Sequence, residues 1–475
     1  MEDRAMTPVV SRREFVRQMG LGAGAATLAG LVLGKWAPGA GDAAATATPR
    51  RPNILFILAD DLGYQSIGAY GGKTYRAMGK DGKVLGPVKT PNIDALAQGG
   101  LRFDYCFSCP VCSPTRSELL TGKYNFRTGF HDITGRNGAT KSLDPQKHPT
   151  LAATLKAAGY DTAVVGKWHL GPAGTMKAPP KDMPPSPHVS ECGFDEQFAY
   201  VSAHLTDYGN PQAGEYTPDR GQEWALKYLD SRKGKNEPFF LYYASPVPHT
   251  PLRPTPLNPD GPEEGVENFP FILEYFDRQI GELVRKLEEL GLRDNTLIFF
   301  AGDNGTAGVA TEMQDGRTIL PGKASLKDTG SRVPLIANWP AAIAPGTTYA
   351  GLVDFTDIMP SCLELAGARA PEGIDGVSFA PQLLGRPGKP REWVHVLHVD
   401  QYFVRDGKYK LRGDGTLYDI TQAPQTETQI PPEKDTEESK AARQRLQAVA
   451  EQLHPGGWRP PAAAVRGAAA KKKSQ

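Results

Sequence analysis

Cysteine is scarce in this sequence, and its placement excludes several kinds of protein. Only five of the 475 residues are cysteine, an odd number that is too small for the disulfide framework of a compact secreted scaffold. None of them precedes Cys106, which excludes an N-terminal lipid anchor attached through cysteine. The chain also has almost no net charge, +1 at pH 7. Nothing in its charge balance therefore favours binding to nucleic acid or to a membrane surface, and we find no internal repeat.

A long hydrophobic run is missing as well. The best candidate, residues 19–34, is rich in glycine and alanine, and it is shorter and less apolar than the ~20 residues of a membrane-spanning helix. It follows Arg12 and Arg13, whose setting is that of a twin-arginine export signal. Residues 37–47 then offer several small-residue cleavage sites.

We therefore expect residues 1–47 to be a twin-arginine signal peptide and linker. The protein would be exported through the Tat translocon, to the periplasm or beyond the cell, without a stable membrane anchor. The alternative is that this segment stays uncleaved and anchors the protein in a membrane.

What the sequence does contain is an alternation of short apolar runs and amphipathic stretches. Short apolar runs that end in glycine or acidic residues are typical of buried strands in a parallel sheet. The expected strands are 53–59, 161–165, 238–244 and 296–301, and the expected helices are 92–98, 150–158 and 271–290. This alternation predicts an α/β fold, with a large, mainly parallel sheet sandwiched by helices, over residues 51–380.

The character of the chain changes after about residue 380. Short strands separated by turns are expected at 394–399, 402–404 and 408–411, followed by a polar loop at 425–438 and a closing helix at 440–453. They predict a smaller C-terminal α+β subdomain with an antiparallel sheet over residues 381–455. The tail, residues 456–475, ends in an alanine- and lysine-rich segment and is expected to be disordered.

Two of the expected strands end in acidic or amide side chains. Asp60 and Asp61 follow the first strand, and Asp303 and Asn304 follow the fourth. Open α/β sheets place their sites at the carboxyl edge of the strands. Hard oxygen ligands of this kind suit Ca²⁺ or Mg²⁺ rather than Zn²⁺. The alternative is that each pair merely caps a following helix.

Positively charged residues also occur in loops marked by glycine or proline. Arg116, Lys167 and Lys323 have this setting, which suits a tetrahedral anion such as sulfate or phosphate. His169 and His249 are candidate proton donors or acceptors near neutral pH. The alternative interpretations are solvated surface lysines and structural histidines.

The chain from residue 112 onward combines Cys112, Pro114 and Arg116 at alternate positions. Because proline disfavours helical backbone in the residue before it, we expect an extended or loop segment with a helical turn starting near Ser117. A thiol beside a cation at the start of a helix would have a lowered pKa and be reactive. The alternative is a buried structural cysteine.

The spacing of Cys106, Cys109 and Cys112 is similar to part of an iron–sulfur loop. A four-thiolate site lacks its fourth ligand nearby, because Cys192 and Cys362 are remote in the sequence. A disulfide between Cys106 and Cys109 is possible after export.

These motifs together resemble the sulfatase family of the alkaline-phosphatase superfamily, in an arylsulfatase-like form. The signature element is Cys-x-Pro-x-Arg followed by Leu-Thr-Gly, found here at Cys112, Pro114, Arg116 and 120–122. Further motifs match in the family's order, at 60–63, 166–171, 249–252, 303–305, 322–323, 332–334 and 417–420. The resemblance extends from about residue 51 to 430 and implies an alkaline-phosphatase-like fold, with residues 51–380 as the sulfatase catalytic domain.

The resemblance also implies a role for each residue. Cys112 would be oxidised to Cα-formylglycine by a formylglycine-generating enzyme, and would bind Ca²⁺, with Mg²⁺ a weaker candidate. The other implied metal ligands are Asp60, Asp61, Asp303 and Asn304. In the same way, Arg116 would support the hydrate of the aldehyde, Lys167 and Lys323 would bind sulfate oxygens, His169 would orient or deprotonate a hydrate hydroxyl, and His249 would assist the leaving group. Ser202 is a further possible match to a family serine.

The implied chemistry agrees with the residues. One hydroxyl of an aldehyde hydrate can attack sulfur, and the second, on the same carbon, can then expel sulfate and restore the aldehyde. The sequence departs from the family at Thr115, where serine or alanine is usual, and at 327–330, where a Glu-Gly-Gly element is common. Because twin-arginine export carries folded proteins, oxidation of Cys112 is expected in the cytoplasm, before folding buries the loop.

The leading hypothesis is an exported, Ca²⁺-dependent sulfuric ester hydrolase that acts on aryl or carbohydrate sulfate monoesters. A phosphonate monoester or phosphodiester hydrolase of the same superfamily is one alternative. A sulfated-glycan binding protein is another, if Cys112 stays unmodified. The expected substrate is a sulfated small molecule or glycan, selected by loops such as 171–190, 200–218 and 307–320.

Overall fold

The computed structural model describes residues 50–78, 82–134, 141–172, 184–201 and 208–459. The expected signal peptide and linker therefore lie outside the described residues, as do Ser202 and most of the C-terminal tail. In the part of the chain that is described, every helix is too short or too polar to cross a membrane.

The central element is a sheet of eight strands in the order β12-β4-β11-β8-β1-β7-β5-β6. All neighbouring pairs are parallel except those of β11, which runs antiparallel to β4 and β8. The strands are β1 Asn53–Ala59, β4 Leu101–Phe107, β5 Asp161–Lys167, β6 Glu196–Val201, β7 Phe239–Ala244, β8 Thr296–Gly302, β11 Arg332–Asn338 and β12 Thr347–Asp354. The expectation of a large, mainly parallel sheet is confirmed.

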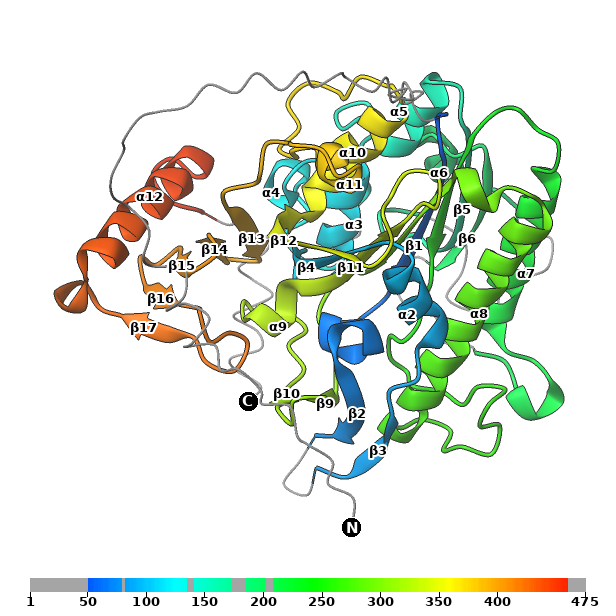
Figure 1. The fold of residues 1–475 in the computed structure, drawn as a ribbon, viewed down its shortest axis with the longest axis horizontal. Coiled ribbons are helices and arrows are strands. Elements are labelled where there is room, and N and C mark those ends of the chain that lie inside the picture. Colours follow the sequence, from blue (N-terminus) through cyan, green and yellow to red (C-terminus); the bar gives the residue numbers. More distant parts are fainter. Residues whose placement is uncertain (1–49, 79–81, 135–140, 173–183, 202–207, 460–475) are drawn as a thin grey trace, which may run out of the picture. The chain divides into compact units, whose positions relative to one another are not determined.

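Helices cover both faces of this sheet because its strands are apolar on both sides. In β1, alternate residues enter two different hydrophobic clusters: Phe56 and Leu58 pack on one face, and Leu55 and Ile57 on the other. Figure 1 shows α3, α5 and α10 on the first face and α2, α7 and α8 on the second. The α-helices of this domain are α2 Pro91–Gln98, α3 Cys112–Thr121, α4 Asn125–Thr128, α5 Leu151–Ala157, α6 Pro187–Glu191, α7 Thr217–Ser231, α8 Phe269–Glu289, α9 Asp328–Ser331, α10 Ile358–Leu365 and α11 Ala380–Leu383.

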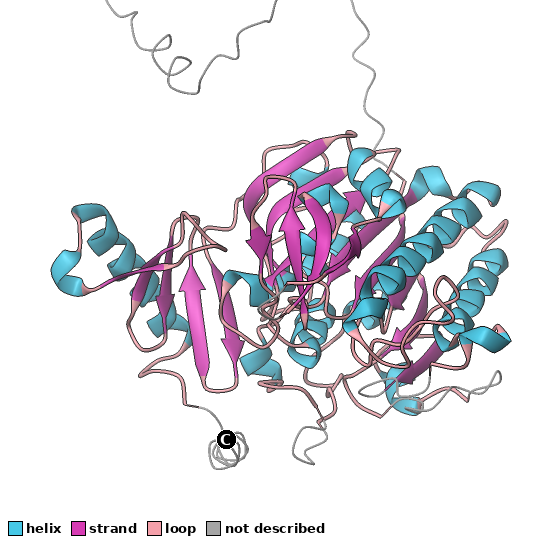
Figure 2. Cartoon of the chain, turned by 90° about the horizontal axis from the view of Figure 1, so that it is seen from below, coloured by secondary structure: helices cyan, strands magenta, loops and turns pink. Residues whose placement is uncertain are grey.

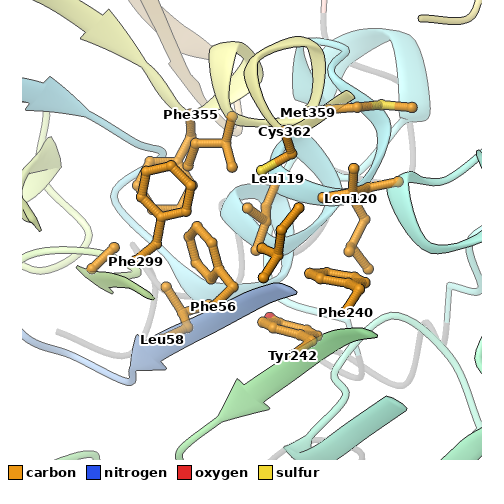
Figure 3. Packing of buried hydrophobic residues seen from close by; sticks show 14 of the residues in the cluster. Phe56, Leu58, Leu119, Leu120, Phe240, Tyr242, Phe299, Phe355, Met359 and Cys362 are labelled. Carbon is orange, nitrogen blue, oxygen red and sulfur yellow. The ribbon is translucent and has the colours of Figure 1, made fainter. Parts of the chain in front are cut away.

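Helix α3 is fixed by the first of these clusters. Its residues Leu119 and Leu120 pack above Phe56 and Leu58 of β1, as Figure 3 shows. The helix begins at Cys112 and not near Ser117 as expected. The proline did not prevent this because it lies in the first helical turn, where the backbone N–H groups have no intrahelical partner to lose.

A second, four-stranded antiparallel sheet was not foreseen from the sequence. Its order is β10-β9-β2-β3. The strands are β2 Gly72–Ala77, β3 Val84–Pro87, β9 Val309–Met313 and β10 Thr318–Ile319. Strands β2 and β9 follow the loops after β1 and β8, so their pairing ties these two loops together beyond the edge of the main sheet.

The C-terminal part forms the expected antiparallel sheet, in the order β13-β14-β15-β16-β17. Figure 2 shows it as a separate group of strands with its own helix. The elements are β13 Val394–His398, β14 Gln401–Arg405, β15 Tyr409–Arg412, β16 Leu417–Asp419, β17 Thr428–Ile430 and α12 Glu437–Leu453. Leu446 of α12 packs on Leu411 and Val404 of the sheet. Strand β17 corrects the expected loop at 425–438: a polar edge strand gives no apolar alternation to detect.

Short 3₁₀ helices complete the described structure. They are η1 Tyr64–Ser66, η2 Gly68–Tyr70, η4 Pro211–Ala213, η5 Val266–Asn268, η6 Arg293–Asn295, η7 Phe355–Asp357 and η8 Pro432–Lys434.

Candidate active site

The two pairs of strand-end residues lie side by side at the carboxyl edge of the main sheet. Strands β1 and β8 are parallel neighbours, with Ala59 opposite Gly302. The backbone N–H of Asp61 donates to Asp303 Oδ1 at 3.0 Å, and Asn304 Nδ2 donates to Asp61 Oδ1 at 2.8 Å. The structure therefore brings these four of the five predicted metal ligands into one buried group.

Cys112 reaches this group from the first position of α3. Its thiol is fully buried and donates to Asp60 Oδ1 at 3.2 Å, with Asp61 Oδ1 at 3.9 Å. Burial raises the pKa of the Cys112 thiol well above its usual value, and Asp303 and Asp60 add to the rise, against a smaller opposite effect of Lys167. The expectation of a lowered pKa is therefore wrong, because desolvation and the carboxylates outweigh the helix start and the cations.

Arg116 lies one helical turn after Cys112, and its side chain links the site to β5. Its Nη2 donates to Asp303 Oδ2 at 2.9 Å, and its Nη1 donates to the carbonyl oxygen of Lys167 at 2.8 Å. The guanidinium is fully buried. A buried guanidinium with these partners is a fixed structural brace between α3, β5 and β8.

Two lysine ammonium groups pair with the carboxylates of Asp60 and Asp61. Lys167 Nζ lies 2.5 Å from Asp60 Oδ2 and Lys323 Nζ lies 2.5 Å from Asp61 Oδ2. Burial on its own raises the pKa of Asp60, but Lys167 and the neighbouring positive charges outweigh it and hold that pKa well below its usual range. The lysine side chains differ in exposure, with 1% for Lys167 and 17% for Lys323, so Lys323 lies nearer to solvent.

The two candidate histidines differ in what the structure shows of them. The side chain of His249 reaches the acidic group, whereas His169 is located only by its burial and its position in the chain. His249 Nε2 is 3.6 Å from Asp61 Oδ2, and its Nδ1 lies 2.5 Å from the carbonyl oxygen of Thr250. A carbonyl oxygen only accepts, so Nδ1 carries a proton and Nε2 is turned to the site. His169 is fully buried, two residues beyond Lys167.

The backbone is strained at this site. Left-handed φ values occur at Asp61 (67°), His169 (57°) and Ala324 (63°), the residue after Lys323. Only one other non-glycine residue in the described ranges has a positive φ, Val399. Such conformations cost about 1–3 kcal/mol each and persist where the surroundings hold them. Their concentration here marks the carboxyl edge as a functional region.

The carboxylate and amide oxygens at this edge of the sheet fit a hard divalent cation. Asp60, Asp61, Cys112 and His249 offer atoms that all lie within 4.8 Å of one another. In the described part of the chain, the buried Oδ1 of Asn304 finds no hydrogen-bond donor, and burial together with Asp60 raises the pKa of Asp303 to about 7. Both features suit a bound cation, which would supply a partner for the amide oxygen and positive charge for the carboxylates.

Some features of the site escaped the sequence reasoning. Tyr242 Oη lies 3.4 Å from Arg116 Nη1, but a tyrosine inside an apolar strand gives no signal. Thr306 Oγ1 accepts from the backbone N–H of Gly63 at 2.9 Å. The only available signal was its position directly after a predicted metal motif.

The cysteine triplet forms no disulfide, and its thiols have different surroundings. All five cysteines are free and buried. Cys106 lies in β4, and the Cys109 thiol donates to Glu118 Oε1 at 3.2 Å, behind α3.

Comparison with known proteins identifies the family. The sulfatase family model matches residues 52–368. The chain belongs to the sulfatase family. A second model, the C-terminal region of N-sulphoglucosamine sulphohydrolase, matches residues 322–452 of this sulfatase. It is a sulfuric ester hydrolase.

Curated relatives and solved structures agree with this assignment. This sulfatase is 33% identical to arylsulfatase A of Bos taurus over 401 residues, which cover 78% of this chain and 76% of that one. It is 30% identical to N-acetylgalactosamine-6-sulfatase of Homo sapiens over 376 residues, covering 72% and 67%. The crystal structure of Ps i-CgsB in complex with k-i-k-neocarrahexaose superimposes with a TM-score of 0.65 at 26% identity, covering 85% and 92%. A Bacteroides thetaiotaomicron structure from a study of glycosaminoglycan metabolism shares the fold, with a TM-score of 0.66 at 24% identity, covering 85% and 99%.

Proposed function

We propose that this sulfatase hydrolyses sulfate monoesters of aryl or carbohydrate alcohols, using formylglycine at position 112 and Ca²⁺. One observation supports this more than any other. The Cys112 side chain lies 3.2 Å from Asp60 in a buried group of three carboxylates and three cations. A thiol whose pKa is raised by burial is a poor nucleophile there, and a soft sulfur is a poor ligand for the hard cation that the acids favour.

Oxidation of Cys112 resolves this mismatch. The aldehyde hydrate at this position supplies an oxygen nucleophile with a second hydroxyl on the same carbon. When bound by Asp60, Asp61, Asp303 and Asn304, Ca²⁺ supplies positive charge that stabilises negative charge on the sulfate oxygens.

The cations of the chain bind and orient the sulfate group. Lys167 and Lys323 project their ammonium groups to the same carboxylates that hold the cation, so a sulfate at the cation contacts both. Arg116 already donates to Asp303 and to the Lys167 carbonyl oxygen, so it holds these groups in place from α3. We assign it a supporting role for position 112.

The histidines serve proton transfer. The Nδ1–H of His249 is fixed by the Thr250 carbonyl, which leaves Nε2 to exchange a proton with the leaving oxygen. His169, at the end of β5, is assigned to the hydroxyls of position 112. These roles follow the family resemblance residue by residue.

We assign the leaving group to a cavity next to the loop that carries Lys323. This cavity of about 800 Å³ begins at Ala324 and extends between residues 324–327 and the C-terminal sheet. Arg412 and Tyr418 both line it, and a positive charge together with an aromatic face suits a sugar that carries a negative charge. This supports a carbohydrate sulfate as the natural substrate, as do the named carbohydrate ligand and substrates of Ps i-CgsB and N-acetylgalactosamine-6-sulfatase.

The route of the protein through the cell is part of the same proposal. Residues 1–47 would direct folded protein to the Tat translocon, and a formylglycine-generating enzyme would act on the Cys112 segment beforehand. The fully buried position of Cys112 in the folded chain supports this order.

The decisive test compares two substrates under two metal conditions. Protein produced together with a formylglycine-generating enzyme is assayed on an aryl sulfate and on an aryl phosphodiester, with Ca²⁺ and after chelation. We expect kcat/KM to be higher for the sulfate and to collapse on chelation, with recovery when Ca²⁺ returns. Diester turnover far above sulfate turnover would reject the proposal in favour of a phosphodiester or phosphonate monoester hydrolase. Turnover that persists after complete chelation would reject the proposed requirement for a metal ion.

A further inference from the structure

Thr306 joins three segments that carry the site. It is fully buried and follows Asn304 by two residues. Its Oγ1 accepts from the backbone N–H of Gly63 at 2.9 Å and lies 2.9 Å from Ser66 Oγ. Its backbone oxygen accepts from the N–H of Gly322 at 3.2 Å and of Lys323 at 3.3 Å. One residue thus connects the loop after β1, the loop after β8 and the loop of the sulfate-binding lysine.

We propose that Thr306 is a positioning residue, which sets the distance between the two oxygen-ligand loops and holds Lys323 at the site. The inference rests on the proposed function, because it concerns Ca²⁺ and sulfate. Thr306 itself touches none of the ligand atoms, so its effect acts through Asp61 and Lys323.

The Thr306 hydroxyl is needed to satisfy the hydrogen-bonding groups of Gly63 and Ser66. A threonine hydroxyl has one proton and two lone pairs, so it can accept from Gly63 and exchange a second hydrogen bond with Ser66. Replacement by valine keeps the shape but leaves the buried Gly63 N–H and the Ser66 hydroxyl without this partner. The loop after β1 then loses its attachment two residues beyond the strained Asp61.

The surrounding loops are too closely packed to replace the lost hydrogen bond by a small movement. A Cβ added to Gly302 would lie 1.9 Å from the carbonyl oxygen of Leu62, and one added to Gly305 would lie 1.9 Å from that of Thr329. The backbone on both sides of the ligand pair is thus in direct contact with its neighbours. Without the Thr306 hydroxyl, we expect the loop after β1 to shift relative to Asp303, which disturbs the geometry of the cation site.

The chain offers a matched control. Thr311 of β9 is also fully buried, but in the described part of the structure its Oγ1 has no hydrogen-bond partner. Thr311→Val therefore repeats the chemical change of Thr306→Val without breaking a hydrogen bond, five residues further along the chain.

The test is calorimetric titration of the metal-free, full-length protein with CaCl₂, combined with kcat and KM on an aryl sulfate. We expect Thr306→Val to weaken Ca²⁺ binding by about 10- to 100-fold, as is typical when the support of a metal ligand is lost. The KM should rise as well, because Lys323 is displaced. Thr306→Ser should keep both constants within about threefold of wild type by restoring the hydroxyl, and Thr311→Val should leave them unchanged.

Each alternative outcome has a separate meaning. Wild-type Ca²⁺ affinity in Thr306→Val, an equal loss in Thr311→Val, or failure of Thr306→Ser to restore binding would overturn the inference. A wild-type protein that binds no Ca²⁺ would overturn the proposed function, and this inference with it. If Thr306→Val does not fold, Ser66→Ala is titrated instead. It removes the hydroxyl that pairs with Oγ1 and should weaken Ca²⁺ binding measurably, and unchanged binding there would also overturn the inference.

Discussion

Two of the buried charge groups among the described residues are built differently: one lies at the carboxyl edge of the main sheet and one at the start of α10. In the second group, the Arg391 guanidinium pairs with both oxygens of Asp357 and donates to Tyr124 Oη at 3.1 Å and to the carbonyl oxygen of Asp375 at 3.2 Å. Asp357 also accepts from backbone N–H groups, and none of these residues has a positive φ. Each nitrogen of the Arg391 guanidinium therefore donates to an acceptor within the fold.

The active-site group is built differently. Among the described residues, the buried atoms Asn304 Oδ1 and Arg116 Nε have no hydrogen-bond partner. The backbone at Asp61 is strained, and burial raises the pKa of Asp303 to about 7. A saturated group of charges holds a fold together, whereas an undersaturated and strained one is prepared for ligands from outside. The following predictions test this distinction.

The largest expected effect is that of Cys112→Ala. Without the precursor of the nucleophile, kcat/KM on an aryl sulfate should fall by at least about 10⁴-fold. Cys362→Ala, in α10 and within the hydrophobic core, serves as a control that removes a buried thiol but should leave kcat/KM of the folded protein unchanged. Retention of a substantial part of the activity in Cys112→Ala would remove position 112 from the mechanism.

Asp61→Asn should separate activity from stability at the site. We expect kcat/KM to fall by about 10²- to 10³-fold, because a ligand and the partner of Lys323 are lost together. The free energy of unfolding in metal-free buffer should change by less than about 1 kcal/mol, since loss of one charge relieves repulsion among the carboxylates and Lys323 can reach solvent. Denaturant unfolding measures this. Loss of several kcal/mol would mean that the site is as structural as the Arg391 group.

Asp357→Asn is the reverse experiment. It leaves the buried Arg391 without its ionic partner, which should lower the free energy of unfolding by about 3–5 kcal/mol. Protein that remains folded should keep kcat/KM within about twofold, because the pair lies outside the site. A large fall in kcat/KM with unchanged stability would show that the two groups had been assigned the wrong way round.

The smallest effect concerns pH. Burial raises the pKa of Asp354, at the start of the same structural group, from 3.8 to about 6. The folded state therefore keeps a proton that the unfolded state loses, so the free energy of unfolding should decrease as pH rises from about 4 to about 6. Asp354→Asn cannot titrate and should flatten this decrease by about 1–3 kcal/mol, given about 1.4 kcal/mol per pKa unit. Unfolding curves at pH 4 and pH 7 measure the difference, and an unaltered slope would contradict the assignment.

The sequence predicts individual helices and strands better than it predicts the contacts between them. Apolar periodicity placed β1, β8 and α8 within a few residues of their observed bounds, and the parallel-sheet rule placed Asp60 and Asp303 at one edge. The start of α3 was misplaced because Pro114 was taken as a barrier, although the first turn of a helix tolerates it.

Other features depend on partners far away in the chain. The pKa of Cys112 rises through burial and through Asp303, which is distant in sequence but adjacent in the folded sheet. The role inferred for Thr306 depends on Gly63 in the same way. Arg391 drew no prediction from the sequence, because its partners Asp357, Tyr124 and Asp375 are distant from it in the chain.

The most direct measurement is the mass of the tryptic peptide 103–116 from active protein made in its native host. The side chain at position 112 should be lighter than that of cysteine by the difference between CH₂SH and CHO, and it should react with a hydrazide or aminooxy reagent. The fraction of aldehyde should rise in proportion to kcat across preparations. Fully active enzyme with an unmodified thiol at position 112 would show that formylglycine is not the nucleophile.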